Sequence, residues 1–359
     1  ITMVGDLLKA EPENIWLQLQ TRIIFALAFC RAPARNPQPI SASTSNNSFA
    51  LYNGTGSKTT YDKILNRNTD EPHTTFPVNW FIDVDQFQPT HMDLSKPNTQ
   101  DWLNGFYDDN LWWALAWINA YDVTHHKAYL RLAEGIFEAM TQIWPTYCFD
   151  GGIYWSWKRD YVNAIPNELF FSTAAHLANR AHNQAYYLDW AHKSMDWFVR
   201  GGMINQHGTI NDGLTSDCQN NNGTTWSYNQ GVILGGLVQL HRASSTFDAT
   251  YLGLASQIAK AALAALSDAN GILHDPCEPN CGGDGTQFKG IFMRNLQELQ
   301  LAAPNEAFEA AIRKNAKSIW RYDRQADTFS VNWAGPFVAP TNASTHSSAM
   351  EALIADLAV

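Results

Sequence analysis

The chain has 359 residues, of which 45% are hydrophobic and 16% charged, so it can bury a large core and is not expected to be disordered as a whole. Its formal net charge of −10, without any cluster of Lys and Arg, argues against nucleic-acid and anionic-membrane partners, because phosphate binding depends on gathered positive charge. The 14 Trp, 13 Tyr and 18 Phe exceed what packing requires, which favours an aromatic groove for a neutral ligand.

The first predicted element is the apolar run at residues 23–30, which is too short to span a bilayer and is expected to form a buried helix. No signal peptide is visible, and we expect a mature secreted chain that has lost one. Asp83, Asp85 and Asp93 resemble a calcium loop only faintly, because no glycine or terminal glutamate falls at the required place. No metal site is predicted.

Two adjacent carboxylates, Asp108 and Asp109, precede a strongly apolar, Trp-rich stretch that is expected to form a helix over Leu111–Tyr121. On one interpretation they only stabilise the helix, Asp108 as its N-cap and Asp109 as a favourable first-turn charge. On the other they form the carboxylate pair that glycoside hydrolysis needs, beside flat aromatic faces against which sugar rings pack.

Helical hairpins then recur along the chain. The pattern Tyr-Leu-x-Leu/Trp-Ala opens a helix at Tyr129, Tyr187 and Tyr251, and each is preceded by a more apolar helix. The expected first helices are Leu111–Tyr121, Leu169–Ala181 and Val232–Arg242, followed by a hairpin of Ile291–Leu301 and Glu306–Trp320 and a last helix over Ser347–Leu357. Recurring hairpins build either an open solenoid or a closed toroid. Because the first helices are apolar nearly all round, we predict an all-α (α/α)6 barrel with these helices as its inner ring, and a single domain over residues 1–359.

Polar motifs obey the same repeat. They stand at the starts of the predicted inner helices, at Tyr107–Asn110, Asn163–Glu168, Tyr228–Gly231 and Gln287–Gly290. In a toroid of parallel inner helices all four would meet at one mouth. A ring of acids and amides walled by aromatic residues is typical of a carbohydrate cleft, although unrelated helix caps would imitate part of it.

The cysteines and glycosylation sequons favour an extracellular protein. Cys277 and Cys281 bracket a turn-forming stretch that could close a small disulfide loop, and no Cys-x-x-Cys pair suggests zinc. Sequons of the form Asn-x-Ser/Thr stand at Asn46, Asn53, Asn222 and Asn342.

These strings resemble glycoside hydrolase family 76, the endo-α-1,6-mannanases. The motifs that carry the resemblance are Tyr107–Asp109 with Trp112–Trp117, Gly151–Trp155, Asn167–Leu169, Tyr228–Gly231 and Phe288–Arg294, with weaker agreement at Trp333–Phe337. The resemblance implies an (α/α)6 barrel, retention of anomeric configuration, no cofactor, Asp108 as nucleophile and Asp109 as general acid/base. An early Trp-Trp-Asn-Ser-Ala-Asn-type motif of the family has no counterpart in residues 1–100, so residues 1–60 are atypical.

For the pair to work, Asp108 and Asp109 must have different pKa values. We expect the dipole of the helix N-terminus to favour an ionised Asp108, placed where its backbone is still non-helical. Its negative charge and the nearby Trp residues should raise the pKa of Asp109, so that Asp109 holds the proton.

Further substrate-binding candidates come from the same motifs and from the loops between them. Aromatic side chains would stack on sugars, although burial is the commoner fate of Trp. Amides and acids would bind hydroxyls or orient the pair, or only cap helices. The two cations, Lys289 and Arg294, would neutralise Asp108 between turnovers, or only cap carbonyls or form ion pairs on the surface. The full set is Tyr107, Trp112, Tyr154, Trp155, Asn167, Glu168, Asp212, Tyr228, Asn229, Gln230, Phe288, Lys289 and Arg294.

We therefore predict a secreted, monomeric endo-acting hydrolase of α-1,6-mannan, extracellular or associated with a cell wall. A transglycosylase that passes mannosyl units to another glycan would form the same intermediate. A mannan-binding protein without activity would bind mannooligosaccharide and not cleave it. Another (α/α) barrel enzyme, such as a sugar epimerase, would need a histidine pair in the cleft, and the motifs contain none.

Overall fold

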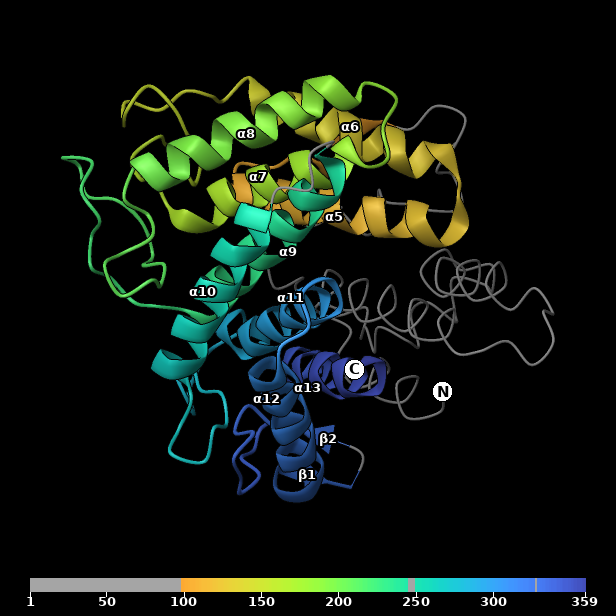
Figure 1. The fold of residues 1–359 in the computed structure, drawn as a ribbon, viewed down its shortest axis with the longest axis vertical. Coiled ribbons are helices and arrows are strands. Elements are labelled where there is room, and N and C mark those ends of the chain that lie inside the picture. The colour runs from red at the N-terminus through yellow and green to blue at the C-terminus, as the bar shows by residue number, and fades with distance from the viewer. Residues whose placement is uncertain (1–97, 245–248, 327) are drawn as a thin grey trace, which may run out of the picture. The chain divides into compact units, whose positions relative to one another are not determined.

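The computed structural model describes residues 98–244, 249–326 and 328–359, which are mostly helical (Figure 1). The expectations for the apolar run at 23–30, the atypical first 60 residues, the early family motif, and the sequons at Asn46 and Asn53 lie outside this range. In chain order the elements are η2 (Thr99–Trp102), α5 (Tyr107–Thr124), α6 (Lys127–Thr141), α7 (Ala164–Ala178), α8 (Gln184–Arg200), α9 (Ser227–Ala243), α10 (Ala249–Leu266), η3 (Gly285–Gln287), α11 (Phe288–Ala302), α12 (Glu306–Ser318), η4 (Ile319–Asp323), β1 (Arg324–Gln325), β2 (Thr328–Phe329) and α13 (Ala343–Ala358).

The helical hairpins predicted from the repeat are confirmed as helices; α12 begins at its predicted residue, Glu306, and the others begin a few residues before their predicted starts. The polar motifs therefore lie within or beside the first turns of α5, α7, α9 and α11 and not ahead of them. By internal contacts the chain divides into two units, Ile1–Gly105 with Trp113–Ile136, and Phe106–Trp112 with Phe137–Val359. The prediction of a single domain stays a prediction.

In the first unit, tryptophan rings join η2 to α5 and α6. Trp102 of η2 meets Trp113 and Trp117 edge-on, with ring centroids 4.7 and 4.5 Å apart. Trp117 in turn stacks on Tyr129 of α6 at 5.2 Å. Gly135 allows the close approach of η2 to α6, because a Cβ at this position would lie 2.2 Å from the hydroxyl of Thr99.

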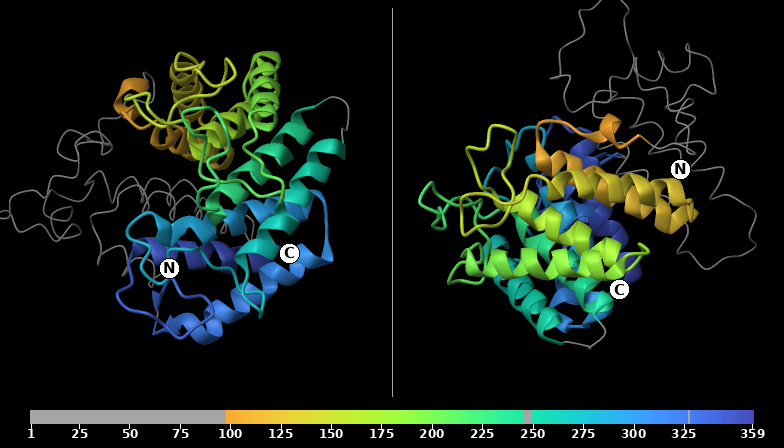
Figure 2. Two further views of the ribbon diagram at one scale, coloured as in Figure 1. Left: turned by 90° about the vertical axis from the view of Figure 1, so that its left-hand side faces the viewer. Right: turned by 90° about the horizontal axis from the view of Figure 1, so that it is seen from above.

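In the second unit, α7, α9, α11 and α13 pack one against the next, and α8, α10 and α12 pair with their preceding helices (Figures 1 and 2). All 15 residues of α7 are buried, whereas α8 buries six of its 17 residues along one stripe. The prediction that the first helix of a hairpin is enclosed and the second amphipathic is confirmed for this pair. In the described part of the chain, no helix combines the length and apolarity needed to cross a bilayer.

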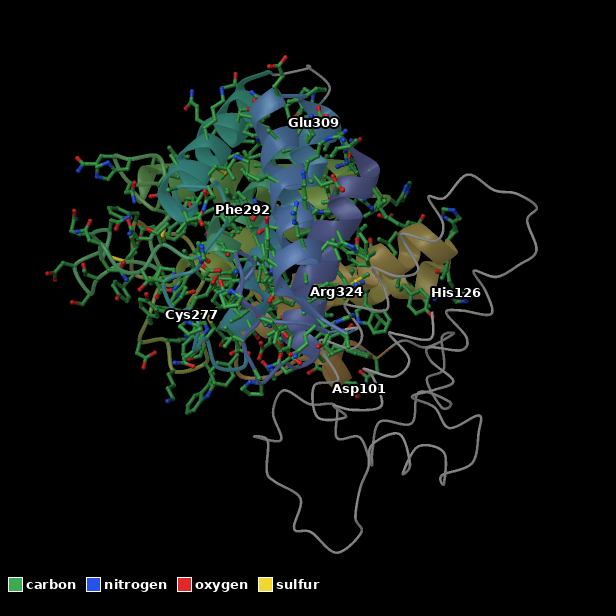
Figure 3. All side chains as sticks on the ribbon, turned by 90° about the horizontal axis from the view of Figure 1, so that it is seen from below. Asp101, His126, Cys277, Phe292, Glu309 and Arg324 are labelled. Atoms are coloured by element: carbon green, nitrogen blue, oxygen red, sulfur yellow. A yellow bond between two sulfur atoms is a disulfide. The ribbon has the colours of Figure 1, made fainter. Side chains whose placement is uncertain are left out.

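Glycine sets the spacing between the central helices. A Cβ at Gly231 of α9 would lie 2.6 Å from the Cα of Phe292 on α11, and one at Gly290 would lie 2.5 Å from the Cα of Ser348 on α13. Phe292, labelled in Figure 3, is fully buried at this contact. Backbones this close leave no room for side chains, so the first turns of α9 and α11 are held firmly together.

The long loops between hairpins are tied by isolated β-bridges and disulfides. Phe106 pairs with Ser156, and Asn163 pairs with Gly213, so each loop docks at the start of an inner helix. The disulfide Cys277–Cys281 predicted from its turn is present, and a second joins Cys148 to Cys218 across 70 residues. Near the end of the chain, β1 and β2 form a two-stranded antiparallel hairpin.

Candidate active site

The acid pair lies in the first turn of α5. Because the helix begins at Tyr107, Asp108 and Asp109 are its second and third residues. The N-cap interpretation of Asp108 and the expectation of a non-helical backbone there are both wrong, because the helix starts before it. Successive side chains on a helix point about 100° apart, so the two carboxylates leave the helix in different directions, yet they lie close enough for the charge of Asp109 to raise the pKa of Asp108.

One oxygen of the Asp108 carboxylate accepts a hydrogen bond and the other does not. The indole Nε1 of Trp155 donates to Oδ2 at 3.2 Å. Oδ1 is buried and has no hydrogen-bond partner. The pKa of Asp108 is raised to about 8, first by burial and then by the charge of Asp109, while the Trp155 hydrogen bond acts in the opposite direction. The helix dipole was expected to keep Asp108 ionised; desolvation outweighs it, so the pair keeps a proton at neutral pH.

Trp155 is fixed to the start of α5 by its backbone. Its carbonyl accepts from the amide of Tyr107 at 2.9 Å, and its own amide donates to the carbonyl of Tyr161 at 2.9 Å. Its ring lies 5.0 Å from that of Phe106, yet 38% of the residue stays exposed. The loop thus delivers an indole that touches Asp108 on one edge and solvent on another.

Two predicted ligand-binding amides, Asn167 and Gln230, hold loops in place. Each is the fourth residue of its helix. Asn167 accepts from the amide of Ile153 at 2.8 Å and donates to the carbonyls of Ile153 and the N-cap residue Asn163. Gln230 does the same with Ile210 and the N-cap residue, Trp226. With these bonds made, both amides hold loops in place, and their predicted contact with sugar hydroxyls stays a prediction.

Asp212, a predicted candidate, belongs to a cluster on the loop before α9. Its Oδ2 accepts from the hydroxyl of Tyr161 at 2.6 Å and from the amide of Asn163 at 3.2 Å. Asn221 donates in turn to the Tyr161 oxygen at 3.0 Å. The pKa of Tyr161 is raised by burial and by Asp212, so the phenol stays protonated and keeps donating.

An aromatic stack stands beside these acids. Phe288 at the start of α11 lies parallel to Tyr228 of α9, with centroids 3.9 Å apart, and Trp226 meets Phe288 edge-on at 5.6 Å. Burial raises the pKa of Tyr228, and Asp212, Asp108 and Glu168 raise it further. These three acids come from three separate segments, so the Tyr228 phenol marks the place where the segments converge.

Three buried polar side chains at this convergence lack partners. Neither oxygen of Glu168 has a hydrogen bond, and the same holds for both amide atoms of Asn229 and for Oε1 of Gln287. They come from α7, from α9 and from the residue that precedes α11. Native interiors satisfy nearly all such groups, so these three side chains have hydrogen-bonding capacity left for a ligand or for water.

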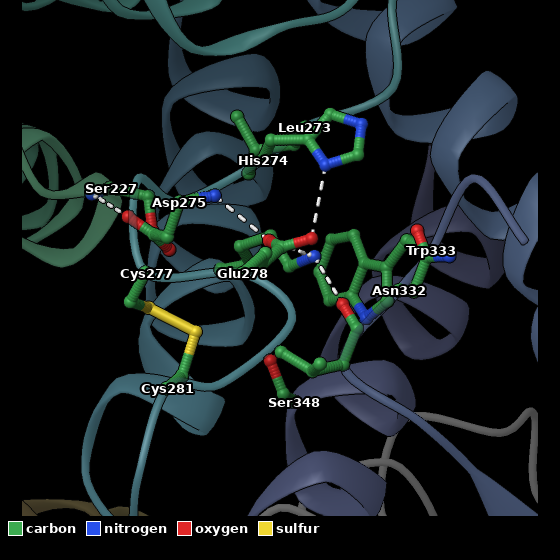
Figure 4. A network of polar contacts seen from close by, with 12 residues as sticks. Ser227, Leu273, His274, Asp275, Cys277, Glu278, Cys281, Asn332, Trp333 and Ser348 are labelled. Carbon is green, nitrogen blue, oxygen red and sulfur yellow. Dashed lines mark hydrogen bonds and ion pairs between the residues drawn. A yellow bond between two sulfur atoms is a disulfide. The ribbon is translucent and has the colours of Figure 1, made fainter. Parts of the chain in front are cut away.

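The two predicted cations do not serve the acid pair. Lys289 is buried, lies 2.6 Å from Oε1 of Glu278, and donates to the carbonyl of Val331 at 2.6 Å. Glu278 also accepts from the amide of Asp275, which binds the first turn of α9 through Ser227 (Figure 4). Arg294 pairs with Glu351 at 2.5 Å. Their charges are paired with Glu278 and Glu351 and not with Asp108. The alternative holds in part: Lys289 binds a carbonyl as expected, but the ion pairs are buried or half-buried and do not lie on the surface.

The remaining candidates differ in exposure. Tyr107 and Trp112 are buried, with 7% and 6% of their surface exposed, and they pack as core residues. The hydroxyl of Tyr154 accepts from the amide of Tyr147 at 3.3 Å, so it braces its own loop. Trp157, outside the candidate set, is 62% exposed on the same loop.

Sequence reasoning left three residues out of the candidate set: Tyr161, Trp226 and Gln287. Tyr161 gave no signal, because its role depends on a loop 51 residues away. Trp226 lies two residues before the motif Tyr228–Gly231, and Gln287 is the first residue of the motif Gln287–Gly290. Their closeness to these motifs was the available signal. Within the described ranges, no three His, Cys, Asp or Glu side chains gather to hold a metal ion.

Convergent acids, unsatisfied amides and stacked rings on helical hairpins are typical of a carbohydrate-active helical protein. The chain belongs to glycosyl hydrolase family 76, whose model matches residues 49–359. A putative mannan endo-1,6-α-mannosidase of Schizosaccharomyces pombe is 30% identical over 226 residues, which make up 58% of this chain and 50% of that protein. The chain spans about half the length of the curated relatives it matches.

Solved structures of the family share the fold. One is an inactive variant of an α-1,6-mannanase from Salegentibacter sp. HEL1_6, with two neighbouring aspartates changed to asparagine, in complex with α-1,6-mannotriose; it covers 95% of this chain and 98% of its own at 19% identity and a TM-score of 0.65. Dfg5 from Chaetomium thermophilum in complex with glucosamine covers 96% and 90% at 19% identity and a TM-score of 0.63. The predicted fold class, an (α/α)6 barrel, is confirmed by this likeness.

Proposed function

We propose that this chain is a glycoside hydrolase that cleaves α-1,6-mannosidic bonds within mannan, with retention of anomeric configuration. The observation that carries the proposal is the carboxylate of Asp108, held at Oδ2 by Trp155 and unpartnered at Oδ1. The names of the fungal relatives and the mannotriose bound to the Salegentibacter variant support the substrate. That variant is inactive with two adjacent aspartates replaced, which supports Asp108 and Asp109 as the working pair.

The proposed reaction is a double displacement. Oδ1 of Asp108 attacks the anomeric carbon while the glycosidic C–O bond breaks, and the departing oxygen takes the proton from Asp109. Water then attacks the mannosyl ester, gives its proton to Asp109, and releases Asp108. The two acids share one proton, and contact between Asp109 and the glycosidic oxygen would draw that proton to Asp109.

The neighbouring groups suit a neutral sugar. Tyr228 and Phe288 give an aromatic face beside Asp108, and sugar rings pack on such faces through their C–H groups. Asn229 supplies an amide that still needs a donor and an acceptor. Each hydroxyl of a pyranose is both a hydrogen-bond donor and an acceptor.

The pH dependence of kcat/KM tests the shared proton. Since the pKa of Asp108 is raised to about 8, the pair retains one proton below that pH and loses it above. The general acid is then absent, so kcat/KM should fall above about pH 8. A pH–rate profile on α-1,6-mannooligosaccharide measures the alkaline limb. A limb near pH 5 would contradict a shared proton.

Trp155→Phe should lower kcat and move that limb upward. The change removes the hydrogen bond to Oδ2, which lowers the pKa of Asp108, so the pKa should rise. Losing a hydrogen bond to a charged group costs roughly 1.5–3 kcal/mol, or about 10- to 100-fold in rate. Trp320→Phe, which changes an exposed Trp on η4, is the matched control and should leave the profile unchanged. A lower rate without a shifted limb would show that the indole only stacks.

The decisive assay uses unbranched α-1,6-mannan, with the first products followed by NMR. Retention gives α-anomers first, and internal cleavage gives a range of chain lengths before any mannose. Initial β-anomers would exclude the double displacement. Release of mannose alone would exclude internal cleavage.

A second candidate is transfer of the mannosyl unit to another glycan. It is favoured by the Chaetomium Dfg5 structure, in which this fold holds an amino sugar, glucosamine. The same intermediate would form, and a sugar hydroxyl would replace water in the second step. Adding glucosamine or mannobiose as acceptor separates the two, since transfer yields products longer than the substrate.

An extracellular location is part of the proposal. Two disulfides support an oxidising compartment, and Asn222 stands exposed on its loop, where a glycan would fit. Asn342, in contrast, uses its side chain to cap α13.

A further inference from the structure

The carboxyl group of Glu168 has no hydrogen-bond or ion-pair partner among the described residues. The residue is fully buried in the first half of α7, and both oxygens lack a hydrogen-bond partner. Among the described residues no cation pairs with it, and the charge that acts on it is Asp212, which is also negative. A buried carboxylate is ordinarily paired or hydrogen-bonded, and Glu168 is neither.

Such surroundings favour the neutral acid. Moving an ionised carboxylate out of water costs several kcal/mol unless a partner offsets it, and a second carboxylate adds repulsion. Burial and Asp212 accordingly hold the pKa of Glu168 well above its ordinary value. A neutral carboxyl carries an O–H donor, and in the protein alone that donor meets no acceptor.

Its position places it at the site and not in an unrelated part of the core. The charge of Asp212 raises the pKa of both Glu168 and Tyr228, and the charge of Asp108 also raises the pKa of Tyr228. The preceding residue, Asn167, is fixed to the loop that carries Trp155, so the helix turn that presents Glu168 is held in place.

Packing alone does not explain a glutamate here. Leucine or methionine would fill similar volume without the roughly 1–3 kcal/mol that an unsatisfied polar group costs. Sequences break such local rules chiefly where function requires it. Asn229, buried in the first turn of the adjoining α9, is unsatisfied at both amide atoms in the same way.

We propose that Glu168 acts as a neutral acid that donates a hydrogen bond to a hydroxyl of the sugar ring held beside Asp108, with the amide of Asn229 as the second recognition group. This inference rests on the proposed function and adds a specificity rule to it. A sugar that lacks an acceptor at that hydroxyl leaves two buried groups unpaired and is rejected. Glu168 is a binding residue and takes no part in bond cleavage.

Glu168→Gln and Glu168→Leu test the neutral state. Gln keeps the size and an N–H donor without an acidic proton, so it should lose only part of kcat/KM on α-1,6-mannan, about threefold. Leu removes the donor and should lower kcat/KM by about 10- to 100-fold, the equivalent of one unmade buried hydrogen bond. A Gln variant as impaired as the Leu variant, and equally well folded, would overturn the proposal, because the ionised carboxylate would then be required.

A stability measurement separates this inference from the mannanase proposal. A carboxyl whose pKa is raised in the folded state destabilises the fold as pH rises above its unfolded pKa, because the unfolded chain releases the proton more readily. Glu168→Gln removes that penalty, so its Tm relative to wild type should rise as the pH increases above about 4.5, the ordinary pKa of a glutamate. Asp212, Asp108, Tyr228 and Tyr161 are present in both proteins, so the difference reports the protonation of Glu168 together with its interaction with Asp212. A Tm difference that does not change with pH would overturn the proposal that Glu168 is neutral, even if the protein cleaves mannan. A wild type that cleaves no mannan would refute the mannanase and leave this readout intact.

Discussion

Replacing either acid of the pair, as Asp108→Asn or as Asp109→Asn, should lower kcat on α-1,6-mannan by on the order of 10⁴-fold, because each removes a group that acts in the transition state. Asn keeps the shape of Asp, and at Asp108 it also removes a charge that is costly to bury, so the fold should be retained. Initial rates and thermal unfolding of the purified variants measure both effects.

The two variants should differ on a substrate with a good leaving group. An aryl mannoside needs little protonation, so Asp109→Asn should complete the first step and then stall, and mass spectrometry should find one mannosyl unit bound to the protein. Asp108→Asn should form no such adduct. Near-normal cleavage of mannan by either variant, or an adduct on Asp108→Asn, would refute the assigned roles.

Lys289→Met should destabilise the protein by about 3–5 kcal/mol without touching the acid pair. The change leaves the buried Glu278 without its cation and removes a donor to the carbonyl of Val331. The ring of Trp333, 4.5 Å from the ammonium, loses a cation–π contact as well. Urea unfolding measures the loss in the free energy of unfolding.

An exposed ion pair supplies the control for this prediction. Arg313 and Glu309 on α12 lie 2.9 Å apart with side chains 55% and 41% exposed, so Arg313→Ala should cost less than about 1 kcal/mol. Combining Lys289→Met with Glu278→Gln removes the stranded charge, and the double variant should lose less stability than the two single variants together. Additive losses would show that Lys289 and Glu278 contribute independently.

The helical architecture was predictable because its signals are local. Apolar residues at three- and four-residue steps marked every hairpin, and the lack of a polar face on the first helices indicated their burial. The predicted starts of the inner helices fell a few residues too late, because the polar motifs were expected to precede the helices and instead lie in or beside their first turns. That error carried over to Asp108, which proved to be a helical residue with a raised pKa.

The candidate site was predictable in its location and less so in its roles. Asn167 and Gln230 fall in motifs that do converge, but their partners, Ile153 and Ile210, lie 14 and 20 residues away on loops whose path the sequence does not encode locally. The disulfide between Cys148 and Cys218 escaped prediction for the same reason, since its partners are 70 residues apart.

The cations Lys289 and Arg294 show a different limit of the sequence. Motif context indicated that they matter, and they do, as the centres of buried ion pairs. Which acid a cation chooses depends on distances that only the folded chain sets, and here Glu278 and Glu351 lie nearer than Asp108.

The anchoring of each rim loop by one inner-helix amide has a consequence for how such barrels diversify. Asn167 and Gln230 each bind a single isoleucine at its N–H and C=O, so the parts of the loop between that isoleucine and the helix that make no such backbone bonds can change length while this anchor stays. Insertions there would remodel the rim without disturbing the scaffold. Loop exchange between homologues, cut at these isoleucines, is therefore a rational route to new glycan preferences.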